Sequence, residues 1–171
     1  MALTVETGAG LAQADSYVSV ADFDAYFLAR YSPDLNIDDD AKERALRRAT
    51  AWIDAQFRGR FPGLKRLGRL QGLEWPRSWV ADREGYAIDP YTVPPEIVRA
   101  TCEAAQRELT EEGSLAPDQE RGGSIKRIKA GSVEIEYGAD AINGTTRPVI
   151  EGILAPILCP PMAIVGRAVR V

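Results

Sequence analysis

The chain has 171 residues, of which 45% are apolar and 27% are charged. This length and composition are typical of one soluble globular domain that buries a hydrophobic core. The formal net charge is -4 and the pI is about 5.0, which argues against a protein that wraps nucleic acid with a large basic surface. The sequence has no histidine, which removes the commonest general base and most transition-metal sites.

The residues around Ser19 predict the start of a first helix, over about Val20 to Arg30. Ser19 can accept a hydrogen bond from the first turn, and Asp22 can return one to the Ser19 N–H. Val18 and Phe23 are spaced to pack against each other across this cap. The pattern establishes where a helix begins and carries no chemistry of its own.

Apolar residues at helical spacing predict a second helix over about Asp39 to Phe57. The triplet Asp38-Asp39-Asp40 suits the positive end of the helix dipole, and we interpret it as an N-terminal cap in preference to a metal site. Arg44, Arg47 and Arg48 fall mostly off the apolar face. We expect these arginines on the solvated side of the helix, from which they could also meet an acidic partner.

A basic loop follows, and it contains no acidic residue. Its five cations are Arg58, Arg60, Lys65, Arg66 and Arg69. Trp75 and Trp79 come next. Cations interleaved with aromatic rings are typical of single-strand binders, because bases stack on rings while cations meet phosphates. The alternative, which we favour, is that the tryptophans anchor the loop to the core and the cations are solvated.

A third helix is predicted to open at Pro94-Pro95 and to end near Gly113, a natural C-terminal cap. Cys102 belongs to its apolar stripe. Cys159, the second cysteine, also lies in apolar surroundings, so we expect two reduced, buried thiols. Neither cysteine has a neighbour at the spacing of a redox pair or a zinc site.

A β-hairpin is predicted at about residues 124–138, with a turn at Ala130-Gly131. Its first strand is basic and its second acidic, so cross-strand pairs such as Arg127 with Glu134 could set the register. A lone hairpin is marginal in water, so we expect this one to pack on the helices or on a neighbouring subunit. The candidate subunit-interface residues are Ile125, Arg127, Ile128, Glu134, Ile135 and Tyr137.

The C-terminal part begins with a short apolar helix over Pro148 to Leu158, which Pro156 breaks. The apolar tail after it has too few neighbours in sequence to fold on itself and needs a docking surface. Its candidate docking residues are Met162, Ile164, Val165, Arg167, Val169, Arg170 and Val171. Because no secretory signal or membrane-spanning run is visible, we expect a protein made and used in a cytoplasm.

These elements together predict a mainly α fold. We expect a small helical domain of three to four helices with one β-hairpin over residues 1–158, and an extended C-terminal tail over residues 159–171. No dinucleotide fingerprint, Walker loop or zinc-protease motif is present. We therefore expect no enzyme, no cofactor, no metal site and no membrane partner.

Several blocks of the sequence resemble the small head–tail connector (adaptor) proteins of tailed bacteriophages. These blocks are Gly8 to Arg30, Arg99 to Glu103, Ile125 to Tyr137 and Arg147 to Leu158, and they occur in the expected order. The resemblance implies a helical adaptor that assembles as a dodecameric ring under the portal protein. Such a ring would extend the channel through which phage DNA passes and would provide a platform for the stopper or tail-completion protein.

The same resemblance implies two further properties and one alternative. The C-terminal tail would engage the portal, and the protein would reside at the head–tail interface of a virion assembled in the bacterial cytoplasm. Relatives of this family are often labelled DnaT-like single-stranded-DNA-binding proteins, which implies a role in replication instead. We prefer the structural role because of the acidic charge balance and the unpartnered tail.

Overall fold

The computed structural model describes residues 2–30, 37–115, 127–130, 133–136 and 148–160. Within them the helices are α1 (Val20–Leu28), α2 (Asp39–Phe57), α3 (Pro95–Thr110) and α4 (Pro148–Leu154), and α4 continues into the 3-10 helix η2 (Ala155–Ile157). The strands are β1 (Leu64–Lys65), β2 (Arg77–Ser78), β3 (Arg127–Ala130) and β4 (Val133–Glu136). The expected fold class, a small mainly α domain with a β-hairpin, is confirmed.

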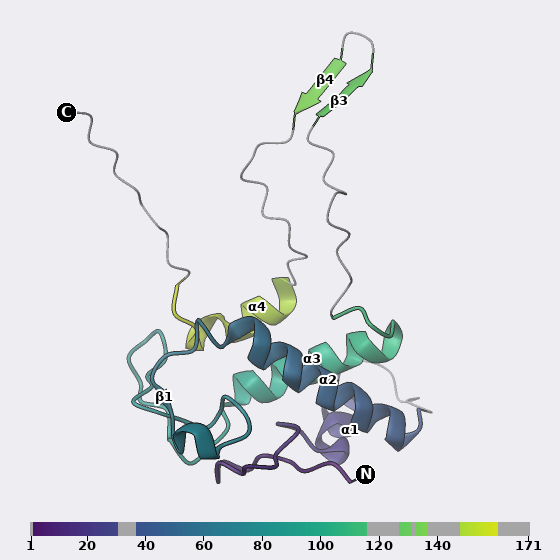
Figure 1. The fold of residues 1–171 in the computed structure, drawn as a ribbon. Helices are drawn as coiled ribbons and strands as arrows, with labels where there is room; N and C mark the ends of the chain where they lie inside the picture. The colour runs from purple at the N-terminus through teal and green to yellow at the C-terminus, as the bar shows by residue number, and fades with distance from the viewer. Residues whose placement is uncertain (1, 31–36, 116–126, 131–132, 137–147, 161–171) are drawn as a thin grey trace, which may run out of the picture.

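The centre of the fold is the pair α2 and α3, which lie side by side (Figure 1). They run antiparallel, because Ala41 in the first turn of α2 lines a shallow pocket with Leu109 and Glu112 at the end of α3. The N-terminus of α2 and the C-terminus of α3 therefore share one end of the molecule. α1 packs on both helices, and α4 packs on α3.

α1 begins where the sequence predicts and ends at Leu28, two residues early. The N–H of Asp22 donates to Ser19 Oγ at 3.1 Å, which confirms the cap. The return bond differs from the expectation, because the donor to Asp22 Oδ2 is the Ser19 hydroxyl, at 2.6 Å, and not the Ser19 N–H. Val18 and Phe23 are both buried, as a packed cap requires.

α2 spans the predicted residues, and its apolar face is buried apart from a half-buried Trp52. Arg44 is exposed as expected. Arg48 is exposed as well, although its Nε lies 2.9 Å from Glu108 Oε1. The solvated placement is wrong for Arg47, which is half-buried and whose Nε lies 2.9 Å from Asp15 Oδ2. Long arginine side chains reach acids on the segments packed beside α2, which a helix considered alone cannot reveal.

Asp38 is the N-cap residue of α2, but its side chain makes no capping hydrogen bond. Asp39 lies 3.3 Å from the ammonium of Lys42, which is buried and also lies 2.9 Å from Asp24 of α1. The start of α2 is thus tied to α1 by a cation. Across the described parts of the chain, acidic and cysteine side chains form no group of three that could hold a metal ion.

The segment between α2 and α3, residues 58–94, is called here the α2–α3 connection. It contains a two-residue antiparallel pair, with Leu64 of β1 opposite Ser78 of β2, and the 3-10 helix η1 (Gly68–Leu70) lies between the two strands in the chain. The sequence analysis treats residues 58–69 as a loop throughout. Strands of two residues are too short to show an alternating pattern, so only the folded chain reveals them.

The hairpin strands β3 and β4 lie inside the predicted limits, but their register corrects the sequence analysis. Arg127 pairs with Glu136, and Lys129 pairs with Glu134, so the suggested partnership of Arg127 with Glu134 is wrong. Ala130 pairs with Val133 and belongs to the strand, not the turn. The register still pairs a basic with an acidic residue at two positions, two residues away along β4 from the expected partner of Arg127. The predicted interface positions Ile125 and Tyr137 lie outside the described residues.

The C-terminal helix is confirmed, with its break at Pro156 inside η2. Cys102 is buried in α3, and this burial raises the pKa of its thiol to about 12. The expectation of a buried thiol is wrong for Cys159, which is exposed because it follows the last turn of η2. The predicted docking residues 162–171 lie outside the described residues. No helix in the described chain is long and apolar enough to cross a bilayer.

Candidate nucleic-acid interface

The two tryptophans of the α2–α3 connection have opposite environments. Trp75 is 0% exposed and packs edge-on against Phe61, with ring centroids 5.7 Å apart, whereas Trp79 is 84% exposed. Trp79 also has a φ of 59°, a left-handed conformation that bulky residues rarely adopt. The expectation that both rings anchor the loop is correct for Trp75 and wrong for Trp79.

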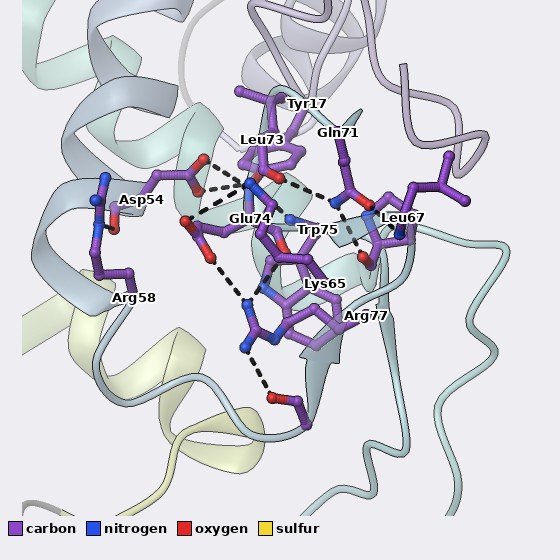
Figure 2. A network of polar contacts seen from close by, with 12 residues as sticks. Tyr17, Asp54, Arg58, Lys65, Leu67, Gln71, Leu73, Glu74, Trp75 and Arg77 are labelled. Carbon is purple, nitrogen blue, oxygen red and sulfur yellow. Dashed lines mark hydrogen bonds and ion pairs between the residues drawn. The ribbon is translucent and has the colours of Figure 1, made fainter. Parts of the chain in front are cut away.

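Trp75 is held by a buried set of polar groups centred on Asp54 of α2 (Figure 2). The hydroxyl of Tyr17 donates to Asp54 Oδ1 at 2.6 Å and accepts the N–H of Trp75 at 3.1 Å. The N–H of Glu74 donates to Asp54 Oδ2 at 2.9 Å. The backbone on the N-terminal side of Trp75 is therefore fastened to α2 and to the N-terminal segment at once.

The protonation of this set follows from its burial. Burial raises the pKa of Asp54 to about 6, although hydrogen bonds from Tyr17 and from the Glu74 N–H act in the opposite direction. Burial, together with the Asp54 carboxylate, also raises the pKa of Tyr17 well above its usual value. At neutral pH Asp54 is ionised and accepts both bonds, and Tyr17 remains a donor.

Arg77 and Gln71 fasten the other side of Trp75, and sequence reasoning missed both. The buried guanidinium of Arg77 donates to Pro62 O at 2.7 Å, to Gly63 O at 3.0 Å and to Glu74 Oε2 at 2.9 Å. Gln71 Nε2 donates to the carbonyls of Leu73 and Pro76 at 3.0 Å each. No sequence pattern predicts the role of either residue, because their partners are mainly backbone carbonyls, which every residue has.

Two of the five predicted cations bond to segments distant in the sequence. Arg66 Nη1 donates to Gly8 O at 2.7 Å, and its guanidinium lies 4.1 Å from the ring centroid of Tyr91. Arg60 Nε donates to Cys159 O at 3.3 Å, and the Cys159 N–H donates back to Arg60 O at 2.8 Å. These arginines join the connection to the N-terminal segment and to the end of η2.

The other three predicted cations differ in exposure. Lys65 is half-buried, and its Nζ lies 3.9 Å from Glu74 Oε1. Arg58 is exposed and donates to Asp54 O in its own helix at 3.4 Å. Arg69 is exposed on η1 and has no hydrogen-bond or ion-pair partner among the described residues. The expected solvation of the basic loop is therefore correct mainly for Arg58 and Arg69.

The glycine-rich opening of the chain supports the same region. The buried carboxylate of Glu6 accepts the N–H groups of Gly8, Gly10 and Leu11 at 2.7 to 2.8 Å. Successive backbone N–H groups of this kind form an anion-binding nest. Because the chain's own carboxylate fills it, the nest is a structural support for Gly8 and Arg66, and not a phosphate site.

The α2–α3 connection also exposes much apolar surface. The described residues include nine exposed large apolar side chains, of which Leu11, Leu28 and Val149 lie elsewhere. The six in the connection are Leu64, Leu67, Leu70, Trp79, Tyr86 and Tyr91. Exposed apolar side chains gathered on one segment mark an interaction site more often than scattered ones do.

A family model described as "Putative DnaT-like ssDNA binding protein" matches residues 1–171. The chain belongs to this family. No curated protein and no solved structure matches it. The match covers the N-terminal segment, the α2–α3 connection and the C-terminal tail alike.

Proposed function

We propose that this protein is a structural head–tail connector of a tailed phage. It assembles as a ring in contact with two other proteins, the portal above it and a stopper or tail-completion protein below it. The ring extends the channel for phage DNA and serves as the attachment platform. The observation that carries the proposal is that the α2–α3 connection exposes apolar and aromatic side chains while Arg60, Lys65 and Arg66 are engaged within the chain.

The physical argument weighs phosphate binding against protein contact. A single-strand binder needs cations that are free to meet phosphates along a groove. Here Arg66 is already bonded to Gly8 and stacked on Tyr91, and the whole chain carries a net charge of -4. Exposed tryptophan and tyrosine with a few arginines is the composition enriched in protein–protein interfaces.

The sequence resemblance extends this proposal to the C-terminal tail and to the β3–β4 hairpin. The C-terminal tail, residues 162–171, engages the portal, and the β3–β4 hairpin packs between subunits. The protein acts at the head–tail interface of the virion, which is assembled in the bacterial cytoplasm. These assignments rest on the apolar character of the tail and on the order of the resembling blocks along the chain.

A second candidate function is single-stranded-DNA binding, and two observations favour it. The family description names that activity. Trp79 is 84% exposed, and Arg69 is exposed ten residues earlier in the chain, so one ring and one cation are available to a base and a phosphate.

A fluorescence titration at about 150 mM salt separates the two candidates. Trp79 is the only exposed tryptophan of the three, so quenching by an oligonucleotide reports on it directly, and a Trp79→Phe variant supplies the background. The connector proposal expects a dissociation constant on the order of 10⁻⁴ M or weaker, as for non-specific contact. Saturable submicromolar binding with quenching that Trp79→Phe abolishes would establish the second candidate. Electron microscopy of the protein mixed with its portal tests the connector itself, through rings on the portal.

A further inference from the structure

One end of α2 gathers arginines around η2, of which Arg60 is half-buried; the exposed Glu84 lies next to Arg83. Arg58 is the C-cap residue of α2 and is exposed. Arg83 is exposed, and its N–H donates to Pro156 O in η2 at 2.8 Å. Arg60 donates to Cys159, which directly follows η2 and its cap residue. We call this region, with Trp79, the basic end.

Trp79 belongs to the basic end through Gly63, which lies three residues after Arg60. The carbonyl oxygen of Trp79 is 3.2 Å from the position that a Gly63 Cβ would occupy. Trp79 combines a left-handed backbone with 84% exposure, so the fold holds this indole ring outward in a conformation that costs free energy. Residues held in such conformations cluster at binding sites, and exposed tryptophans are the commonest interface hot spots.

The opposite end of α2 is mainly acidic, although Arg44 and Arg48 are also exposed there. Asp38, Asp39 and Asp40 are exposed at its N-terminus, and Glu111 and Glu112 are exposed where α3 ends. The helix dipole accounts for the aspartates, since it favours negative charge at a helix N-terminus. It opposes the two glutamates, which stand at the negative end of α3. Glu112 is paired instead with Arg48, whose Nη1 lies 3.0 Å from Glu112 Oε1.

We infer that the basic end of one copy of this chain docks on the acidic end of a second copy, head to tail. The inference rests on the proposed ring and names the surfaces that would form it. α2 has 19 residues and is therefore about 28 Å long, so the two ends of one chain cannot meet. The chain's own tail is a poor occupant of the basic end, because residues 161–171 contain two arginines and no acid.

This arrangement has a consequence for assembly. A contact between two different surfaces is heterologous, and repeated copies close into a ring when the rotation between them closes. A contact of the basic end with itself would instead stop at a dimer and would bring arginines together. Charge complementarity also speeds the correct encounter and disfavours the reversed one.

Cross-linking tests the head-to-tail contact directly, because the exposed Cys159 already lies at the basic end. Asp40→Cys adds a second exposed thiol at the acidic end, while Cys102 stays buried. A short bismaleimide should then produce a ladder of dimers, trimers and longer products, which Cys159→Ser abolishes. Ala55→Cys, at an exposed position within α2, is the matched control and should give no ladder.

The outcomes separate the inference from the proposed function. A ladder with Asp40→Cys that matches the Ala55→Cys control, or products that stop at the dimer, would overturn the head-to-tail contact even if rings are seen on the portal. A clear ladder without portal attachment would leave the contact standing and remove the connector role.

Charge exchange provides a second, independent readout by sedimentation at low salt. Arg83→Glu and Glu111→Lys should each weaken self-association, and the double variant should restore it, because every head-to-tail contact contains one residue of each kind. Trp79→Ala should weaken it about 30-fold, the loss typical of a hot spot. Arg69→Glu, the same charge change on η1, is the control and should have little effect. Failure of the double variant to recover would contradict the pairing of these two ends.

Discussion

The helices and the α2–α3 connection are stabilised by different interactions. The helical part buries apolar side chains at regular spacing, such as Leu46, Ala49 and Ile53 along α2. The connection has two strands of two residues and one short 3-10 turn, and it is held by buried polar groups around a single tryptophan. A segment with this much internal hydrogen bonding can stay ordered while it exposes apolar side chains to a partner.

The difference shows where the molecule can carry function. Exposed apolar side chains on a helix would compete with the core face for burial. In the connection, backbone groups bond to Asp54 of α2 and to Arg77 and Gln71, independently of the side chains that point outward. The exposed residues Trp79, Leu70 and Tyr86 are therefore available to bind a partner without loss of the connection's own hydrogen bonds.

The largest expected effect separates the two tryptophans. Trp75→Ala should destabilise the protein by about 3–5 kcal/mol, because it empties the centre of the connection. Trp79→Ala should change the free energy of unfolding by less than about 0.5 kcal/mol, because its ring makes few contacts with the core. Urea unfolding followed by circular dichroism measures both. Similar small losses for the two variants would mean that the connection does not depend on a buried anchor.

A smaller effect should appear in the pH dependence of stability. The pKa of Asp54 is about 6 in the folded protein and near 4 in the unfolded chain, so the folded state favours the protonated form. Its stabilising contribution is complete below about pH 4 and is lost as the pH rises through about 6. The stability of the wild type relative to Asp54→Asn should therefore be greater at pH 4 than at pH 7.5.

Urea midpoints at the two pH values test this, and the comparison with Asp54→Asn removes the titration of all other carboxyls. The variant should be less stable at both, because an amide N–H would face the donors of Tyr17 or Glu74. A difference that grows with rising pH would show that the hydrogen bonds outweigh burial at Asp54.

The smallest effect concerns the strained backbone at Trp79. Trp79→Gly should stabilise the protein by up to about 1 kcal/mol, because glycine adopts a φ of 59° without a steric cost. Trp79→Ala keeps the Cβ and should show no such gain. Differential scanning calorimetry of the pair gives the comparison. Marked destabilisation by glycine would place the Trp79 side chain in the fold's own packing and not at a binding surface.

Much of the helical part was predictable from the sequence. α2 has the predicted limits, and α1 begins at the predicted cap, because apolar spacing and capping are local properties. The candidate site was predicted only in outline. The basic, tryptophan-containing segment was recognised, but Arg77 and the opposite burial of Trp75 and Trp79 were not, because both depend on segments distant in the sequence.

The sequence by itself determined the helix positions, the hairpin strands and the absence of histidine chemistry, since each follows from residue type and short-range spacing. The tertiary structure alone decided which cations are available and which ring faces water. Arg66 is engaged because Gly8 and Tyr91, 58 and 25 residues away, are brought beside it. Contacts of that range depend on how α2, the connection and the N-terminal segment pack together, and no local pattern encodes them.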